Sequence, residues 1–274
     1  KPVCVTGASG YIASWIVKYL LERGFTVHAT VRDSGKASSV AHLWKAAQGA
    51  AGKLVLFDAD LIKPGSFKAA IEGCELVIHT ASPFVIRGFT DPYEALVRPA
   101  VEGTENVLDS CNAVQSVKRV VLTSSVAAIA YGHDKTVFTE ADWTDATSPD
   151  AYPYVRSKTI AERAARDWVA AEGGDIEFCT VNPSVVLGPV AIGMALPSCK
   201  IPTSAAAPAA TLNCRHPSMA EALPARAPWP FIAQAEALGR MQPRLAIQTN
   251  NGISSGQSCA VCSALTASNA RPAP

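Results

Sequence analysis

Short apolar runs recur along the first 190 residues, and stretches with helical spacing lie between them. The clearest such stretch covers residues 11–23, where apolar side chains recur every three or four positions and Gly24 follows as a helix stop. These apolar positions are Ile12, Trp15, Ile16, Tyr19 and Leu20. Short buried strands that alternate with helices are typical of βαβ units and a parallel sheet.

The same pattern places the remaining elements. The strands that we expect span residues 2–6, 25–31, 54–57, 76–79, 120–123 and 178–181. The expected helices span residues 11–23, 40–47, 66–71, 93–111 and 155–172. Because crossovers between parallel strands are right-handed, the pattern predicts an α/β fold with a Rossmann-type doubly wound parallel sheet.

The composition changes sharply near residue 190. Residues 191–274 hold ten of the 19 prolines but only two of the 23 acidic residues, Glu221 and Glu236. Proline interrupts both helices and sheets, because it lacks the backbone N–H group. We therefore expect a packed domain over residues 1–190 and an irregular Pro/Ala/Ser-rich tail over residues 191–274.

Charge and hydropathy exclude several classes of function. A formal charge of +1 argues against nucleic acid as a partner, because phosphate contacts need a basic surplus. No window of about 18 uninterrupted apolar residues exists, so we expect no membrane partner. The only C-x-x-C pair, Cys259 and Cys262, lacks a second pair, so we expect no metal. Cysteines within apolar runs and the lack of a signal peptide favour a cytoplasmic location.

A glycine-rich turn joins the first expected strand to the first expected helix. The sequence TGASGYIA at residues 6–13 places Gly7 at a tight turn and Gly10 where a backbone approaches a pyrophosphate. The helix start offers free N–H groups and a positive dipole end to an anion. A dinucleotide cofactor is therefore expected here. Its contacts on this turn are expected to be Gly7, Ser9, Gly10, Tyr11 and Ile12.

The end of the second strand bears on the choice between the two dinucleotides. Arg32 suits the 2′-phosphate of NADP, and Lys36 follows it in a polar loop, whereas Asp33 suits the 2′-hydroxyl of NAD. We expect NADP(H) to be preferred, since a planar guanidinium matches a phosphate, and keep NAD(H) as an alternative. In a second interpretation, Arg32 is solvated and pairs with Asp33.

Tyr154 and Lys158 are four residues apart and so share one face of a helix. An ammonium group nearby lowers the pKa of a phenol, and such a pair exchanges a proton with a substrate oxygen. Tyr152 lacks a lysine at this spacing. Ser124 and Ser125 end the fifth strand, where a hydroxyl can polarise a carbonyl oxygen; for Ser124 we favour a hydroxyl that satisfies its own loop.

These motifs together resemble the extended short-chain dehydrogenase/reductase family, which is NAD-dependent epimerase/dehydratase-like. They are similar in particular to its branch of dihydroflavonol reductases, cinnamoyl-CoA reductases and aldehyde reductases. The resemblance runs from Val3 to about Pro189. It rests on VTGASGYIA (5–13), ATVRD (29–33), Asp60 and Leu61, HTASP (79–83), VEGTENVL (101–108), KRVVLTSS (118–125), YVRSK (154–158) and NPSVVLGP (182–189).

The resemblance implies roles for individual residues. Ser125, rather than Ser124, joins Tyr154 and Lys158 as the catalytic group, and the last two also contact the cofactor. Further cofactor contacts are implied at Asp60, Leu61, Ala81, Ser82, Pro183 and Ser184. His79 is interpreted as a packed strand histidine.

The resemblance also implies an activity. We expect an NADP-dependent oxidoreductase that reduces a small-molecule carbonyl of the aldehyde, ketone, dihydroflavonol or cinnamoyl-CoA type, acting as a monomer or homodimer. A nucleotide-sugar epimerase or dehydratase and a non-catalytic NADP(H)-binding protein are alternatives. Two departures stand out: Ala13 replaces the usual third glycine, and the tail stands in place of the C-terminal substrate lobe.

Overall fold

The computed structural model describes residues 1–84, 88–134, 137–139, 141–184 and 186. The tail expected over residues 191–274 therefore lies outside the described residues, as do Cys259 and Cys262. All the site residues predicted from the sequence lie inside them.

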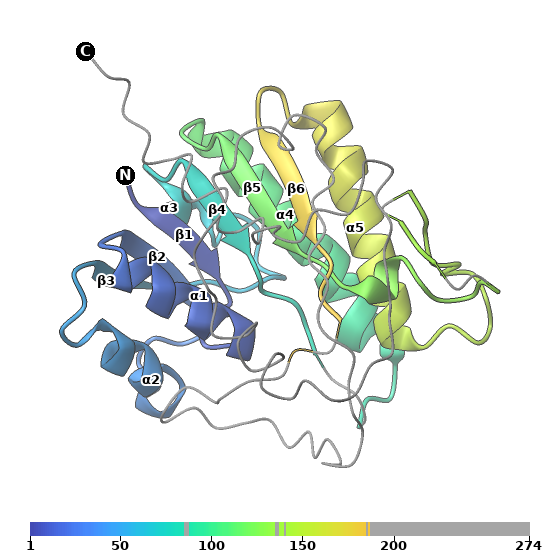
Figure 1. The fold of residues 1–274 in the computed structure, drawn as a ribbon, viewed down its shortest axis with the longest axis horizontal. Coiled ribbons are helices and arrows are strands. Elements are labelled where there is room, and N and C mark those ends of the chain that lie inside the picture. The colour runs from blue at the N-terminus through green and yellow to red at the C-terminus, as the bar shows by residue number, and fades with distance from the viewer. Residues whose placement is uncertain (85–87, 135–136, 140, 185, 187–274) are drawn as a thin grey trace.

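The core of the molecule is a parallel sheet of six strands in the order β3-β2-β1-β4-β5-β6 (Figure 1). The strands are β1 Val3–Thr6, β2 Thr26–Val31, β3 Lys53–Asp58, β4 Leu76–His79, β5 Arg119–Thr123 and β6 Glu177–Val181. The order turns back on itself between β1 and β4, which is the arrangement of a doubly wound sheet. The predicted Rossmann-type fold is thus confirmed.

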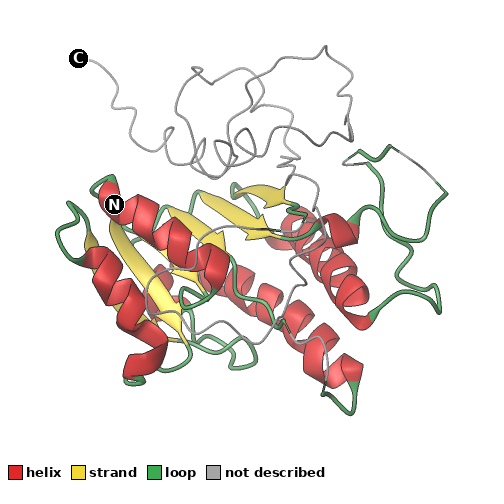
Figure 2. Ribbon diagram, turned by 60° about the horizontal axis from the view of Figure 1, so that its bottom comes forward, coloured by secondary structure: helices red, strands yellow, loops and turns green. Residues whose placement is uncertain are grey.

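Helices cover both faces of the sheet (Figure 2). They are α1 Tyr11–Glu22, α2 Ala37–Ala47, α3 Lys68–Ile71, α4 Arg98–Val114 and α5 Pro153–Glu172, with a π-helical turn η1 Tyr93–Val97 and a 3-10 turn η2 Val126–Ala128. One apolar core joins α1 and α2 to the sheet through residues such as Leu20 and Leu43. A second core joins α3, α4 and α5 to the opposite face through residues such as Phe67 and Leu108.

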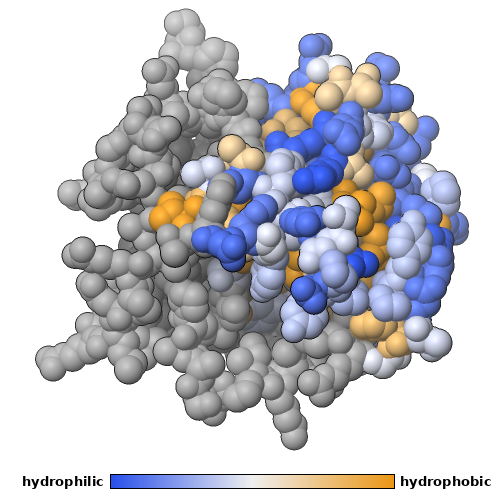
Figure 3. All heavy atoms as spheres, turned by 90° about the vertical axis from the view of Figure 1, so that its right-hand side faces the viewer, coloured by the Kyte–Doolittle hydropathy of each residue, from blue (hydrophilic) through white to orange (hydrophobic). Residues whose placement is uncertain are grey.

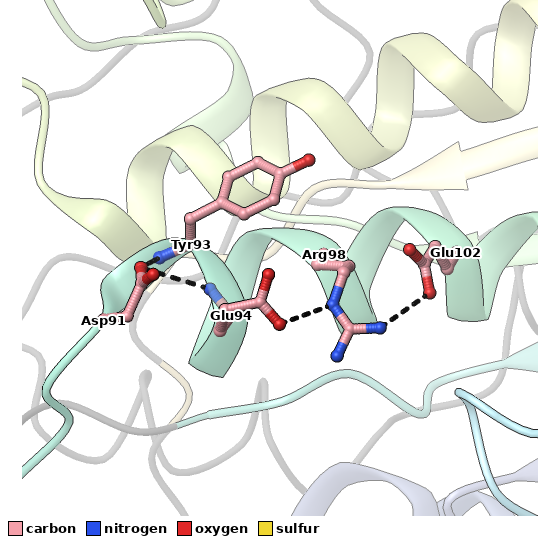
Figure 4. Close-up of polar contacts among 5 residues, drawn as sticks. All are labelled: Asp91, Tyr93, Glu94, Arg98 and Glu102. Atoms are coloured by element: carbon pink, nitrogen blue, oxygen red, sulfur yellow. Dashed lines mark hydrogen bonds and ion pairs between the residues drawn. The ribbon is translucent and has the colours of Figure 1, made fainter.

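The helix expected over residues 93–111 begins instead as the π-helical turn η1 and continues to Val114 as α4. Asp91 caps the turn, because its Oδ1 accepts hydrogen bonds from the backbone N–H groups of Tyr93 at 2.8 Å and Glu94 at 3.4 Å. Figure 4 shows Arg98 bridging Glu94 and Glu102, each one helical turn away. Hydrophobic periodicity alone does not distinguish a π-helical turn from an α-helical one.

Other boundaries differ by a few residues. The helix expected to begin at residue 40 begins at Ala37, and the one expected over 66–71 is confined to Lys68–Ile71. Cys4, Cys74 and Cys111 are buried free thiols, as their apolar surroundings indicate, and Cys179 is buried too.

The described helices include none that combines the length and the apolar character needed to cross a bilayer. The same residues contain no cluster of His, Cys, Asp and Glu side chains suited to a metal ion. In the face shown in Figure 3, hydrophilic side chains are interspersed with smaller apolar areas.

Candidate active site

The turn after β1 packs directly against the loop after β4. Gly7 has a φ of 65°, and a Cβ atom on it would lie 2.8 Å from the Cα of Ala81. The Ala8 N–H donates to the Thr30 carbonyl at 2.8 Å, which ties the same turn to the end of β2. Only glycine tolerates both the positive φ and this close approach at position 7. The turn thus brings the ends of β1, β2 and β4 together.

The N-terminus of α1 is open to an anion in the described structure. Its N-cap is Gly10, no side chain caps it, and no acidic residue occupies its first turn. Ser9, Tyr11 and Ile12 are half-buried around this end, and Gly10 is exposed. Free N–H groups and the helix dipole make such a terminus suited to a phosphate group.

Arg32 and Lys36 are both exposed in the segment that follows β2. Asp33 accepts a hydrogen bond from the Gly35 N–H at 2.9 Å. No ion pair joins Asp33 to Arg32 within the described residues. Arg32 is thus exposed to solvent, as the second interpretation has it, but the described structure does not show it paired with Asp33.

His79 is a structural link beneath the site. Its Nδ1 lies 2.8 Å from the Thr6 hydroxyl, and its Nε2 lies 3.3 Å from the Thr104 hydroxyl. Thr104 donates to the Ala100 carbonyl at 2.7 Å, so it accepts from Nε2–H, and Nδ1 accepts from Thr6. Burial first, and the charge of Lys158 second, lower the pKa of His79 to about 3. The interpretation as a packed strand histidine is confirmed.

Two residues of α4, Gly103 and Asn106, position the loop that follows β3. The sequence pattern had assigned a role to neither of them. A Cβ on Gly103 would lie 2.6 Å from the Leu61 side chain, so this glycine lets Leu61 pack on α4. Asn106 Nδ2 donates to the carbonyls of Leu61 at 3.1 Å and Lys63 at 2.8 Å. Both belong to VEGTENVL, one of the segments that carry the family resemblance, and this was the signal in the sequence that could have pointed to them. Asp60 is exposed on the loop that they hold.

Tyr154, Lys158 and Ser125 converge beyond the carboxyl end of β5. Lys158 Nζ lies 6.0 Å from the centroid of the Tyr154 ring and donates to the Thr123 carbonyl at 3.4 Å. The Ser125 side chain lies close enough to Tyr154 to influence the pKa of its hydroxyl. Helix α5 supplies the first two groups, and the end of β5 supplies the serine. Tyr152, by contrast, is 71% exposed.

The pKa of Tyr154 moves in the direction opposite to our expectation. Burial raises it above its ordinary value, the neighbouring Ser125 side chain opposes this rise, and Tyr131 adds to it. The expected lowering by Lys158 is therefore wrong for the protein alone, because desolvation of the phenolate dominates. Burial also lowers the pKa of Lys158 to about 8, while the Glu162 carboxylate opposes that change.

The Ser124 hydroxyl does not form the hydrogen bond within its own loop that we expected. Its backbone N–H donates to the Val181 carbonyl at 2.8 Å, but its buried hydroxyl has no hydrogen-bond partner within the described residues. A small pocket is lined by Ser124, Lys158, Ala81 and Ser82, among others. This hydroxyl can therefore form a hydrogen bond with a group or a water that enters the pocket.

The loop after β6 is attached to the end of β5. The Val126 N–H donates to the Pro183 carbonyl at 3.0 Å, and the Ser125 hydroxyl donates to the same oxygen at 3.5 Å. Pro183 and Ser184 are half-buried there. The structure thus brings the predicted residues together at one edge of the sheet. The phosphate turn, the loop after β4 and the Tyr–Lys–Ser group are continuous along that edge.

Comparison with known proteins shows the family to which this chain belongs. The sequence profile of the NAD dependent epimerase/dehydratase family matches residues 3–214. The chain belongs to this family. The match ends inside the segment that the sequence analysis assigns to the tail.

Curated relatives support the predicted reductase branch. The chain is 48% identical to a cinnamoyl-CoA reductase of Medicago truncatula, over 69% of this chain and 58% of the relative. It is 42% identical to a dihydroflavonol 4-reductase of Gerbera hybrida, over 68% of this chain and 52% of the relative. The chain therefore matches little more than half the length of these relatives.

A solved structure gives the same picture. The yeast methylglyoxal/isovaleraldehyde reductase complexed with NADPH superposes with a TM-score of 0.59 at 31% identity. The superposition covers 69% of this chain and 59% of the yeast chain. The fold and the reductase relationship are thus supported by sequence and structure together.

Proposed function

We propose that this protein is an NADPH-dependent oxidoreductase that reduces a small-molecule carbonyl, with Tyr154 as the proton donor. The observation that carries the proposal is the convergence of Tyr154, Lys158 and Ser125 beside the glycine turn. The relatives named above are reductases of carbonyl compounds, which supports the same reaction class.

The residues at the sheet edge fit a dinucleotide with a 2′-phosphate. The turn at Gly7 leaves no room for a side chain, α1 presents an uncapped terminus, and Arg32 and Lys36 are exposed cations. The unpartnered Ser124 hydroxyl lies in the pocket beside Lys158. When bound, NADPH supplies the hydride. Asp60, Leu61, Ala81, Ser82, Pro183 and Ser184 are the further cofactor contacts that we propose.

The protein's own groups then handle the oxygen of the substrate. The raised pKa keeps Tyr154 protonated near neutral pH, so its hydroxyl can deliver a proton to the carbonyl oxygen. The Ser125 hydroxyl donates a hydrogen bond to that oxygen and stabilises the charge that develops on it. The Lys158 ammonium stabilises the phenolate that Tyr154 becomes after it has given up the proton.

Aromatic side chains near Tyr154 favour a substrate with an apolar body. Phe84 meets the Tyr154 ring edge-on, with centroids 5.3 Å apart, and is itself 55% exposed. Tyr131 is 47% exposed and acts electrostatically on Tyr154. Exposed rings of this kind bind flat apolar groups by stacking and edge contacts. We therefore propose aldehydes, ketones, dihydroflavonols or cinnamoyl-CoA thioesters as substrates.

The test is NADPH oxidation followed at 340 nm with a panel of such carbonyl compounds. We expect turnover with the parent protein and a loss of about 10²- to 10⁴-fold in kcat for Tyr154→Phe. Tyr152→Phe is the matched control, because Tyr152 is exposed and should leave kcat unchanged. Turnover that persists in Tyr154→Phe contradicts the assignment of the proton donor.

Other results favour the alternative functions. NAD that remains bound through purification, together with turnover of a nucleotide sugar, favours an epimerase or dehydratase. Binding of NADPH without oxidation favours a non-catalytic protein. A cytoplasmic location and a monomeric or homodimeric state are kept as predictions, to be tested by fractionation and by light scattering.

A further inference from the structure

We propose that Glu162 and Asn182 are positioning residues for the reaction, which hold Ser125 in place and set the charge of Lys158. This inference rests on the proposed function and goes beyond it, since neither residue contacts the reacting groups as a proton donor or acceptor.

Glu162 is a buried carboxylate one helical turn after Lys158 on α5. Its side chain is fully buried, and Arg166 neutralises it through two hydrogen bonds at 3.2 and 3.1 Å to its Oε1. Its other oxygen accepts a hydrogen bond from Asn182 Nδ2 at 2.8 Å. Burial of a charge is costly, and here the hydrogen bonds from Arg166 and Asn182 offset part of that cost.

Asn182 connects this carboxylate to the serine. It follows directly after β6, is 1% exposed, and also donates from Nδ2 to the Ser125 carbonyl at 3.0 Å. An amide NH₂ group has two hydrogens, and here one points to Glu162 and the other to Ser125. The two acceptors also fix the orientation of the amide. Helix α5 and the ends of β5 and β6 are thus joined through one side chain.

The same carboxylate follows Lys158 by one helical turn, and both side chains line the small pocket at the end of β5. Among the described residues, the titratable groups that face Lys158 are Glu162 and Tyr154 from α5, and His79 from β4. Burial lowers the pKa of Lys158, and Glu162 opposes this change. Without the carboxylate, the ammonium would lose its proton at a lower pH. One buried group therefore influences both the lysine and the serine beside Tyr154.

The experiment uses the full chain and the variants Glu162→Gln and Asn182→Ala. Glu162→Gln keeps the shape but removes the charge, and Asn182→Ala removes the donor to Ser125. The control is Thr180→Val, which removes the buried hydroxyl that accepts from Arg166 at 2.8 Å and leaves the Glu162–Asn182–Ser125 connection intact. Folding of each variant is checked by its thermal transition.

The first readout is the titration of Lys158 in the cofactor-free protein, followed by NMR of ¹³Cε-labelled lysine and assigned with Lys158→Met. We expect the titration to move to lower pH in Glu162→Gln and to stay in place in Asn182→Ala and Thr180→Val. A Lys158 titration that is the same in Glu162→Gln as in the parent overturns the electrostatic role.

The second readout is NADPH oxidation with a carbonyl substrate. Since small displacements of an aligned group cost up to about 100-fold in rate, we expect kcat to fall about 10- to 100-fold in Glu162→Gln and Asn182→Ala, with KM nearly unchanged. An equal loss in Thr180→Val shows a merely structural role and overturns the proposal. If the parent itself does not turn over, the proposed function fails, whereas the NMR titration still decides the role of Glu162.

Discussion

Lys158 lies one helical turn after Tyr154, with its ammonium 6.0 Å from the centroid of the tyrosine ring and 3.4 Å from the Thr123 carbonyl. The ammonium is therefore held by the end of β5. This arrangement keeps a cation beside a phenol whose own pKa is raised by burial. Tyr154 is thus the protonated donor, and Lys158 is the positive charge beside it.

We predict that Lys158→Met stabilises the fold while it abolishes activity. Burial lowers the pKa of Lys158 from 10.5 to about 8, so the folded state binds the proton less tightly than the unfolded state. The resulting penalty is fully present below about pH 8 and disappears as the pH rises to 10.5. Urea unfolding at pH 7 should show a gain of at most about 3 kcal/mol, because the loss of the hydrogen bond to the Thr123 carbonyl offsets part of it.

The control for this prediction is Lys53→Met, at an exposed lysine of β3. It should change the free energy of unfolding by less than about 0.5 kcal/mol at either pH. A Lys158→Met variant that is less stable than the parent at pH 7, or whose gain is as large at pH 10.5, contradicts the prediction.

Gly7→Ala should damage both the fold and cofactor binding. The left-handed φ costs about 1–3 kcal/mol for a residue with a side chain, and the contact with Ala81 adds to this cost. Gly49→Ala is the matched control, because Gly49 has a φ of 72° with nothing within 4 Å of the added atom. Thermal unfolding and NADPH titration should both show a larger loss at position 7. Equal effects at the two positions argue against the close approach.

Arg32→Gln should change the choice between cofactors. If the guanidinium binds the 2′-phosphate, its removal weakens NADPH binding about 10- to 100-fold and leaves NADH binding unaffected. Fluorescence titration with each cofactor measures the two dissociation constants. Arg98→Gln serves as the control, since Arg98 pairs with Glu94 and Glu102 on α4. An equal loss of affinity for both cofactors refutes the role of Arg32.

His79 should make the fold sensitive to acid. Burial, aided by the charge of Lys158, lowers its pKa from 6.5 to about 3, so the unfolded chain binds a proton that the folded chain does not. Stability is therefore lost as the pH falls from about 6.5 towards 3. The non-titrating variant His79→Asn should show a flatter stability profile between these values.

The matched variant for this prediction is His133→Asn, at an exposed histidine. Its free energy of unfolding should follow the parent profile across the same pH range. A parent profile that stays flat from neutral pH to pH 4 is incompatible with a buried neutral His79.

Much of the candidate site followed from local sequence. Gly7 and Gly10 lie between a strand and a helix, and the four-residue spacing of Tyr154 and Lys158 places them on one helical face whatever surrounds the helix. The roles of Thr104 and Asn106 were not accessible in this way. Asn106 contacts a loop 43 to 46 positions earlier, and periodicity carries no information about such partners.

The two serines at the end of β5 illustrate the same limit. Adjacent hydroxyls look equivalent in the residue pattern, and the family resemblance rather than the pattern favoured Ser125. Only the structure shows that Ser125 lies beside Tyr154 and that the Ser124 hydroxyl is unpartnered within the described residues. The direction of the pKa of Tyr154 depended on burial, which overrides the effect of a neighbouring charge once a phenol is desolvated.

The sequence by itself determined the alternation of strands and helices, the glycine turn and the Tyr–Lys pair, because these depend on residues within about one or two turns of each other. Only the tertiary structure decided which buried groups form hydrogen bonds with one another, as Asn182 does with Glu162 and with the Ser125 carbonyl. Those contacts depend on which elements pack together and how much water they exclude, and both quantities belong to the folded chain as a whole.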